Sequence, residues 1–311
     1  MKVAVIIPAY KVKQFIVPLL NKIDDSISRI FLVDDFCPEN SGDYAASNYN
    51  DPRLTVIKHE KNRGVGGAVI SGYKAFLKDE SLDIAVKLDG DGQMNPDLIN
   101  ELVSIIGSNK ADYSKGNRFF DLSTIKSMPA LRLFGNSMLS LTNKFVNGYW
   151  HIMDPTNGFT AIHKSALKKI DLEKIDHRYF FESDMLFRLG ISRVAVADFP
   201  MTAVYGEEKS NLNISRIIFE FPPKYLNRFL KRIFYAYFIR DFNAGSIQLF
   251  FGLVLILFGT IFGAFKWYNS IATNDAATVG TVMLAALPVI IGSQLLLGFL
   301  NFDVQNTPKA S

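Results

Sequence analysis

Short apolar runs that end in polar or glycine-rich turns recur along the first part of the chain. Four of these runs are rich in β-branched residues and are typical of buried strands, at residues 3–7, 30–33, 54–58 and 83–88. Between them the apolar spacing is helical, over residues 14–27 and 69–77, and Asn95-Pro96-Asp97 has the form of a helix start. Strands that alternate with helices predict an α/β fold whose mostly parallel sheet carries helices on both faces.

The pattern continues less regularly to about residue 204. Residues 111–116 predict another strand, which ends at Asn117-Arg118, and residues 129–146 have helical character. The polar turn at 154–159 precedes a short apolar run at 160–162. A helix is expected to begin within 179–184 and to continue over 185–189, and further short strands are expected at 194–196 and 200–204.

The turns after the first four strands are polar or rich in glycine. They are Pro8-Ala9-Tyr10, Asp34-Asp35, residues 62–67 and residues 89–93. In a parallel α/β sheet, ligands bind at the carboxyl ends of the strands, so these turns predict one shared crevice. The turn at 62–67 lacks the dinucleotide-binding spacing, and no Gly-Lys-Ser/Thr follows it. A nucleotide is therefore favoured, whereas a dehydrogenase or a P-loop ATPase is not.

The segment Asp89-Gly90-Asp91-Gly92-Gln93 carries the strongest chemical pattern. Two carboxylates separated by one small residue leave a strand on the same side, and the glycines allow a sharp turn with room for a ligand. Such hard oxygen donors suit Mg²⁺ or Mn²⁺, and Gln93 can add a neutral oxygen. Aspartate and glycine are also common in ordinary turns, so this segment by itself leaves both interpretations open.

The C-terminal third of the chain changes character. Between residues 214 and 239, basic and bulky apolar residues interleave at helical spacing, which indicates amphipathic helices in a membrane interface. Uncharged runs at 247–265 and 279–300 are long enough to span a bilayer, and the short linker between them predicts a hairpin. The six basic residues before the first run place that side in the cytoplasm. Glycines in both runs would permit close helix packing, which also allows a homo-oligomer.

Composition narrows the function classes. The chain has 311 residues, of which 49% are hydrophobic, and its formal charge of +4 is too small and too dispersed to indicate a nucleic-acid partner. The single cysteine, Cys37, excludes an internal disulfide and a cysteine-based zinc site. No signal-peptide pattern precedes the first strand, so we expect the N-terminal part in the cytosol.

The residues at the strand ends resemble a known family. Segments 3–10, 34–35, 64–68 and 89–93 look like the GT-A fold, the Rossmann-like fold of inverting nucleotide-sugar glycosyltransferases, over about residues 1–210. With the basic helices and the hairpin, the whole chain is similar to polyprenyl-phosphate glycosyltransferases, including the dolichyl-phosphate mannose synthases. The expected organisation is a catalytic domain at 1–210, juxtamembrane amphipathic helices at 211–243, a transmembrane hairpin at 244–301 and a short tail at 302–311.

This resemblance implies roles for particular residues. It places a nucleotide-sugar donor, a UDP- or GDP-sugar, at Pro8, Ala9, Tyr10, Asp35, Arg63, Gly64, Asp89 and Gly90. It places the divalent metal at Asp89, Asp91 and Gln93, and a polyprenyl or dolichyl phosphate acceptor at Arg118 and Arg132, where Lys209 is a further cation that can serve. Asp154 falls near the acceptor. The QxxRW-type motif of processive polysaccharide synthases is absent, which argues against polymerisation.

Two departures from the family pattern leave the base and the sugar open. Lys11 stands where the family commonly has an acidic or amide residue, and Phe36-Cys37-Pro38-Glu39 replaces its usual Gly-Ser-x-Asp run.

Together these features predict a metal-dependent, inverting transfer of one sugar to a lipid phosphate on the cytosolic face of a membrane. A lipid phosphate is anionic near neutral pH and needs cations rather than a strong base. If the acceptor were a hydroxyl of a glycan or of a lipid-linked oligosaccharide, a base would be required, and Asp154 and Asp184 are the candidates. The helix dipole offers a structural explanation for Asp184.

Two other function classes are alternatives. One is a non-catalytic, membrane-anchored nucleotide-binding scaffold, which the intact Asp89, Asp91 and Gln93 disfavour. The other is a nucleotidyltransferase, which typically has a glycine-rich basic loop after the first strand, where this chain has only Pro8-Ala9-Tyr10-Lys11.

Overall fold

The computed structural model describes residues 1–120, 130–201 and 214–309, without the side chains of residues 130–132 and 214–218. The chain divides into two compact units, of which the first covers Met1–Phe229 together with the C-terminal residues from Pro308 and the second covers Leu230–Thr307. The two units are described separately below.

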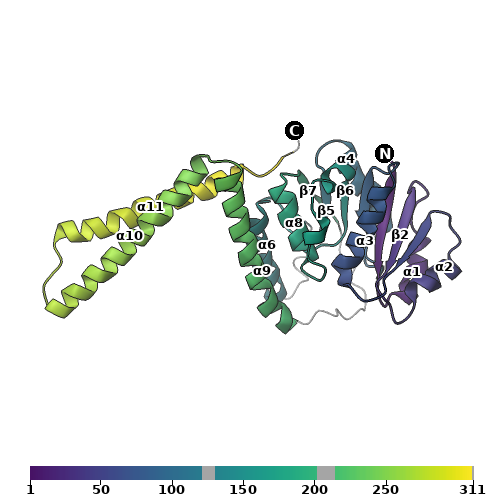
Figure 1. The fold of residues 1–311 in the computed structure, drawn as a ribbon, viewed down its shortest axis with the longest axis horizontal. Helices are drawn as coiled ribbons and strands as arrows, with labels where there is room; N and C mark the ends of the chain where they lie inside the picture. The colour runs from purple at the N-terminus through teal and green to yellow at the C-terminus, as the bar shows by residue number, and fades with distance from the viewer. Residues whose placement is uncertain (121–129, 202–213, 310–311) are drawn as a thin grey trace. The chain divides into compact units, whose positions relative to one another are not determined.

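The described part of the first unit is built on a seven-stranded sheet with the order β3-β2-β1-β4-β6-β5-β7 (Figure 1). All neighbouring strands are parallel except at β6, which is antiparallel to both β4 and β5. The expected mostly parallel α/β sheet is therefore confirmed. The strands are β1 (Val3–Ala9), β2 (Arg29–Asp34), β3 (Leu54–Lys58), β4 (Ile84–Lys87), β5 (Tyr113–Asn117), β6 (Thr160–His163) and β7 (Val196–Pro200).

Helices pack on both faces of this sheet, as the apolar spacing predicts. The helices that begin in this unit are α1 (Lys13–Leu20), α2 (Ser41–Asn48), α3 (Gly64–Lys78), η1 (Pro96–Leu98), α4 (Ile99–Gly107), α6 (Ala130–Asn147), α7 (Lys164–Leu167), η2 (Leu172–Lys174), α8 (Phe181–Ile191) and α9 (Ile214–Phe234). Alternate residues of β1 enter different cores: Ile6 packs with α3 and α8, whereas Val5 and Ile7 pack with α1 and α4. Apolar cores thus cover both faces of the sheet, and the carboxyl ends of its strands remain available to form a binding site.

Several local expectations differ from the structure. The helix expected over 14–27 ends at Leu20, and the chain then turns while Ile23 and Ile27 stay buried in the core, so an apolar spacing alone overstates the helix. Helix α2 follows a polar, nearly pattern-free segment and was not expected. Two strands were expected at 194–196 and 200–204; the structure has the single strand β7, and residues 202–204 lie outside the described residues.

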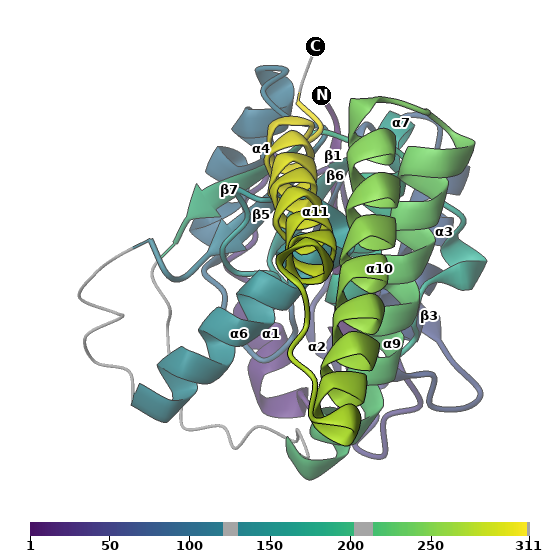
Figure 2. The same ribbon diagram turned by 90° about the vertical axis from the view of Figure 1, so that its left-hand side faces the viewer.

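The second unit contains two long apolar helices that run side by side as a hairpin (Figures 1 and 2). They are α10 (Ala244–Thr273) and α11 (Val279–Gln305), and a short π-helix, η3 (Tyr235–Ile239), precedes them. Both are long and apolar enough to cross a membrane, and few residues in their most apolar parts are buried within the protein. The two expected spans lie inside these helices.

Close glycine contacts join the two helices of the hairpin, and an ion pair joins the end of α9 to α11. A Cβ on Gly252 would lie 3.1 Å from the Gly292 carbonyl oxygen, so the backbones approach closely at this point. Arg232, near the end of α9, donates from Nη1 and Nη2 to the two carboxylate oxygens of Asp303 on α11 at 2.8 and 2.9 Å. Tyr237 donates its hydroxyl to the same carboxylate, which lies buried in the last turn of α11.

Candidate active site

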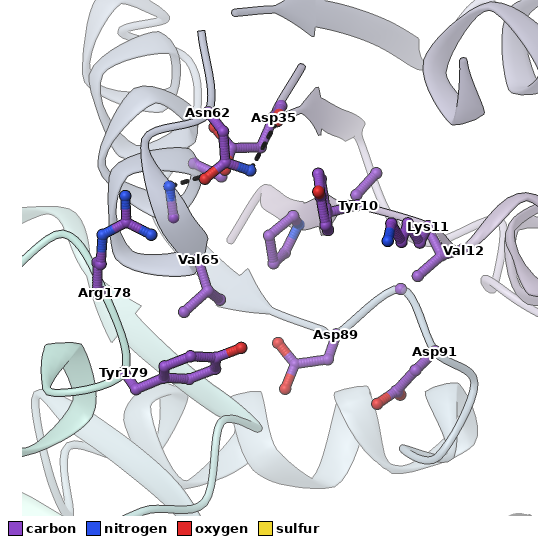
Figure 3. A pocket seen from close by; sticks show the side chains of 15 residues that line it. Tyr10, Lys11, Val12, Asp35, Asn62, Val65, Asp89, Asp91, Arg178 and Tyr179 are labelled. Atoms are coloured by element: carbon purple, nitrogen blue, oxygen red, sulfur yellow. Dashed lines mark hydrogen bonds between the residues drawn. The ribbon is translucent and has the colours of Figure 1, made fainter. Parts of the chain in front are cut away.

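A pocket of about 600 Å³ opens at the carboxyl ends of the central strands (Figure 3). It brings together most of the residues that sequence analysis assigned to a nucleotide-sugar donor and a metal. Its walls are formed by Pro8, Ala9, Tyr10, Lys11, Val12, Asp35, Asn62, Gly64, Val65, Ala68, Asp89, Gly90, Asp91, Arg178 and Tyr179. Arg63 and Gln93 are not among these residues, but their backbone N–H groups bond to Asp35 and Asp91, which are.

The turn after β1 is held by the loop that follows β2. Lys11 has a positive φ of 58°, which is unusual for a residue with a side chain, and its N–H donates to the Sγ of Cys37 at 3.1 Å. The thiol of Cys37 also lies 3.2 Å from the Ser41 hydroxyl. The lone cysteine therefore supports the backbone on which Lys11 enters the pocket.

Asp34 is the last residue of β2 and Asp35 follows it, but the two carboxylates have different roles. Asp34 accepts hydrogen bonds from the N–H groups of Cys37 and Gly42 at 2.7 Å each, and thereby positions α2. Asp35 accepts from the N–H groups of Arg63 and Gly64 at 2.8 Å each.

His59 completes the surroundings of Asp35. Its Nδ1 lies 2.7 Å from Asp35 Oδ1 and its Nε2 lies 2.8 Å from the Ser71 hydroxyl, so the ring joins β3 and α3. One carboxylate at the pocket wall thus fixes the start of the glycine-rich turn.

The glycine-rich turn is the first turn of α3, and it packs directly on residues 176–178. The N–H of Gly67 donates to the His177 carbonyl at 3.0 Å, and a Cβ on Gly66 would lie 2.5 Å from the Asp176 carbonyl oxygen. Gly64 has a φ of +84° and faces the same backbone.

This close packing places Arg178 and Tyr179 in the pocket wall, where Figure 3 shows Tyr179 on the side toward which Asp89 points. Sequence analysis did not identify either residue as part of the site, because neither lies in a strand-end motif.

Asp89 and Asp91 lie just beyond β4 and line the same pocket (Figure 3). The turn between β4 and η1 contains Gly92 at a φ of +73°, and the N–H of Gln93 donates to Asp91 Oδ1 at 3.0 Å. Burial, together with the neighbouring charge of Asp89, raises the pKa of Asp91. The side chains expected at one edge of the sheet do meet there.

These two carboxylates fit a divalent cation whose coordination shell is completed by oxygen atoms of the donor. No cluster of three or more histidine, cysteine or acidic side chains suited to a metal is present in residues 1–120, 130–201 and 214–309. Mg²⁺ and Mn²⁺ are commonly held by one or two carboxylates, with substrate phosphates and water completing the shell. Asp89 and Asp91 supply that number of hard oxygen ligands.

Lys87 and Glu182 lie behind Asp89; sequence analysis assigned neither to the site and explained Glu182 only by the helix dipole. The Lys87 ammonium donates to Asp89 Oδ1 at 2.8 Å and to Glu182 Oε1 at 3.2 Å. Burial alone would lower the pKa of Lys87, but the two carboxylates raise it above the ordinary lysine value. The ammonium is therefore charged throughout the physiological pH range.

Arg118 and Asp154 form a bidentate ion pair. Arg118 donates from Nε and Nη2 to Asp154 at 2.7 and 3.0 Å, and the Asp154 side chain is fully buried. Burial alone would raise the pKa of Asp154, but its hydrogen bonds and charge contact with Arg118 lower it. Nearby, burial lowers the pKa of Lys115 to about 8.

Asp184 is fully buried between α8 and α9 and is not among the residues that line the pocket. It accepts from Arg228 Nε at 2.6 Å, from Arg188 Nη2 at 3.3 Å and from the Asp176 N–H at 2.8 Å. The remaining two predicted acceptor residues cannot be placed: Lys209 and the side chain of Arg132, at the start of α6, lie outside the described residues.

Comparison with known proteins agrees with this architecture. The chain is 30% identical over 216 residues to a UDP-N-acetylglucosamine–dolichyl-phosphate N-acetylglucosaminyltransferase of Methanococcus voltae, covering 65% of this chain and 85% of that protein. It is 29% identical over 211 residues to an undecaprenyl-phosphate mannosyltransferase of Micrococcus luteus, covering 67% and 85%.

Solved structures share the fold. A glucosyl-3-phosphoglycerate synthase from Mycobacterium tuberculosis, crystallised with UDP, superposes with a TM-score of 0.54 at 16% identity, covering 74% of this chain and 79% of that one. The same synthase in complex with Mn²⁺, UDP-glucose and phosphoglyceric acid gives 0.53. The family model for glycosyl transferase family 2 matches residues 4–171, more than half of the chain. The protein belongs to glycosyl transferase family 2.

Proposed function

We propose that this protein moves one sugar from a nucleotide-sugar to a polyprenyl or dolichyl phosphate at the cytosolic face of a membrane, with inversion at the anomeric carbon. The observation that carries the proposal is that Asp35, Asp89 and Asp91 line one pocket at the carboxyl edge of the sheet. The relatives in Methanococcus voltae and Micrococcus luteus are named for sugar transfer to lipid phosphates, which supports the choice of acceptor.

The donor would lie across this pocket with its nucleoside against Pro8, Ala9 and Tyr10. Asp35 holds the turn at Arg63 and Gly64, which keeps this wall in place. A divalent cation, held by Asp89 and Asp91 with Gln93 close by, would supply charge neutralisation of the diphosphate leaving group. That role suits carboxylates that face the pocket rather than the core.

The acceptor phosphate would be bound by Arg118, with Arg132 and Lys209 as further cations. Asp154 orients the Arg118 guanidinium by accepting two of its N–H groups. An acceptor oxygen then attacks the anomeric carbon from the face opposite the diphosphate, a carbon–oxygen bond forms, and the nucleoside diphosphate leaves with the electrons of the bond that breaks. Because the attacking phosphate is already anionic, no general base is needed.

The structure disfavours a hydroxyl acceptor that depends on Asp154 or Asp184 as a base. Both side chains are fully buried, and each accepts hydrogen bonds from arginine. A base must come within hydrogen-bond reach of the proton it removes, and these carboxylates are already occupied by cations. We assign Asp154 to positioning Arg118 and Asp184 to the packing of α8 against α9.

Membrane association is supported by exposed apolar surface. Helices α10 and α11 present most of their apolar residues to the surroundings, as expected for helices covered by lipid. In the first unit, α6 exposes Phe134, Met138 and Leu141, which lie on one stripe at helical spacing. Basic residues before α10 support a cytoplasmic location for that end of the hairpin.

A product assay tests this function. The full chain in detergent is incubated with UDP- or GDP-sugars, polyprenyl phosphate and Mn²⁺, and the lipid product is isolated and its anomeric configuration determined. We expect one sugar per lipid, in the configuration opposite to that of the donor. Transfer to a glycan hydroxyl with polyprenyl phosphate inert, or retention of configuration, would contradict the proposal. Full activity after chelation of divalent metal would contradict the proposed metal dependence.

A further inference from the structure

Lys87 is a buried cation that has no role in the reaction proposed above. It is the last residue of β4, and its side chain is 1% exposed. Because side chains alternate along a strand, Lys87 points to the same face as Ala85, which belongs to the core beneath α3 and α8. A charged side chain in such a place is costly unless it is paired. Its partners therefore identify its role.

Those partners come from two separate elements. Asp89 follows two residues later on the same side of the chain, and Glu182 comes from the first turn of α8. The Asp89 side chain is 28% exposed and reaches the pocket, whereas that of Glu182 is 16% exposed. One ammonium thus connects a pocket carboxylate with a more deeply placed one.

The contact uses only one oxygen of Asp89. Lys87 binds Oδ1, and no hydrogen bond from the described residues reaches Oδ2. Gly158, just before β6, leaves the space that both groups occupy: a Cβ there would lie 2.3 Å from Lys87 Nζ and 2.6 Å from Asp89 Oδ2. The pair is therefore confined from the side of β6 as well.

We propose that Lys87 is a positioning residue that fixes the orientation of Asp89 for the divalent cation, with Glu182 as the counter-charge that keeps the ammonium in place. The proposal rests on the metal site of the proposed function. With Oδ1 held by Lys87, Asp89 offers Oδ2 to the cation as a single oriented ligand. Partners behind a metal ligand commonly set its orientation, and removing one typically weakens metal binding by about 10- to 100-fold.

A charge-balanced double variant isolates this role. Lys87→Met with Glu182→Gln removes one positive and one negative charge, so the net charge around the pocket is unchanged while Asp89 loses its partner. Mn²⁺ binding to the full chain in detergent is measured by electron paramagnetic resonance of the free ion, with Mn²⁺ alone and with Mn²⁺ plus UDP or GDP. We expect binding at least about tenfold weaker than in the wild type.

The single variant Glu182→Gln is the matched control, because it keeps the contact between Lys87 and Asp89. It should bind Mn²⁺ several-fold more tightly than the double variant. Equal affinities of the folded double variant and the wild type, or of the two variants, would overturn the proposal.

Gly158→Ala provides an independent test if the double variant does not fold. The atoms that its Cβ would meet first are the ends of two side chains, so the fold can accommodate the methyl group by displacing the pair. We expect Mn²⁺ affinity to fall by about tenfold in a protein that still unfolds cooperatively. Gly135→Ala in α6, where a Cβ meets nothing within 4 Å, should leave Mn²⁺ affinity unchanged. Wild-type affinity in folded Gly158→Ala would count against the role of Lys87.

These measurements also separate this inference from the proposed function. If the wild type binds Mn²⁺ and nucleotide but transfers no sugar to polyprenyl phosphate, the acceptor assignment fails and the role of Lys87 is still decided by the variants. If the wild type binds no Mn²⁺, both the metal site and this inference fail.

Discussion

Arg118 binds both carboxylate oxygens of Asp154, with its Nε 2.7 Å from Oδ2 and its Nη2 3.0 Å from Oδ1. The aspartate is fully buried, whereas the arginine side chain is 31% exposed, so only the arginine is accessible to a ligand. Asp154 can act on a ligand only through Arg118. Under the proposed function, Asp154 would therefore influence the acceptor through Arg118 without touching it.

Replacing Arg118 with lysine should weaken acceptor binding selectively. Lysine keeps the charge but cannot form the two parallel bonds to Asp154, so the cation is no longer oriented. We expect the KM for polyprenyl phosphate to rise by about tenfold, with a donor KM within about twofold of the wild type. Steady-state kinetics with each substrate varied in turn measure this. An equal rise in both KM values would contradict the acceptor assignment.

The pair also predicts a pH dependence of stability. Arg118 lowers the pKa of Asp154 below the ordinary value of 3.8, so the folded state holds a charge that the unfolded state loses first as the pH falls. The contribution is fully present above pH 3.8 and is lost as the pH falls through the folded-state pKa. Asp154→Asn should cost roughly 2 kcal/mol of unfolding free energy at pH 7. The difference from wild type should shrink below pH 3.8 in chemical denaturation; a difference independent of pH would contradict it.

Asp91→Asn should separate activity from stability. Since burial raises the pKa of Asp91, the folded protein bears a cost for its charge, and the amide removes that cost. We expect transfer to fall by at least about 100-fold, because a metal contribution of several kcal/mol is lost. Thermal unfolding of the same sample should occur at the wild-type temperature or above. Activity close to that of the wild type would exclude Asp91 as a metal ligand.

Asp184→Asn should have the opposite signature. Its carboxylate pairs with Arg228 and Arg188 in the interior, and breaking a buried pair costs about 3 kcal/mol. We expect that loss in unfolding free energy, with kcat per folded molecule within about twofold of the wild type. Arg228→Met is the matched variant and should be less destabilising, because Arg188 still faces Asp184. A stable but inactive Asp184→Asn would restore Asp184 as a base.

Gly66→Ala should disturb nucleotide binding from outside the pocket. Its Cβ would lie 2.5 Å from the Asp176 carbonyl oxygen, so the segment that carries Arg178 and Tyr179 must shift. We expect UDP or GDP affinity, measured by calorimetry, to fall by about tenfold, equal to 1.4 kcal/mol. Gly107→Ala is the control, because a Cβ there makes only an ordinary contact at 3.8 Å. Wild-type affinity in Gly66→Ala would show that this segment does not bind the nucleotide.

The central strands and the location of the pocket were predictable because both depend on local patterns. Buried parallel strands appear as apolar runs, and the rule that ligands bind at their carboxyl ends needs no knowledge of the helices. Asp35 follows β2, and Asp89 and Asp91 follow β4, so they meet because these two strands flank β1 in the sheet. The antiparallel direction of β6 could not be predicted from its four residues, because no local pattern encodes it.

Other parts of the site depend on contacts between distant segments. Arg178 enters the pocket because α3 begins with glycines that accept the backbone at 176–178, a relationship across more than 100 positions that no periodicity encodes. Lys87 gave a similar difficulty, since a lysine at the end of an apolar run is ordinarily taken as exposed. Its burial and its pairing with Glu182 depend on how α8 packs against β4, which the sequence does not show.

The ion pair between Arg232 and Asp303 has a consequence for how the chain is inserted. Arg232 precedes the first apolar helix and Asp303 closes the second, so the entrance and the exit of the hairpin are tied together. If the hairpin spans a bilayer, as proposed, both helices must cross it, because a single crossing would leave the two charges on opposite sides. The enzyme would then begin and end its membrane passage in the same compartment, whatever lipid it serves.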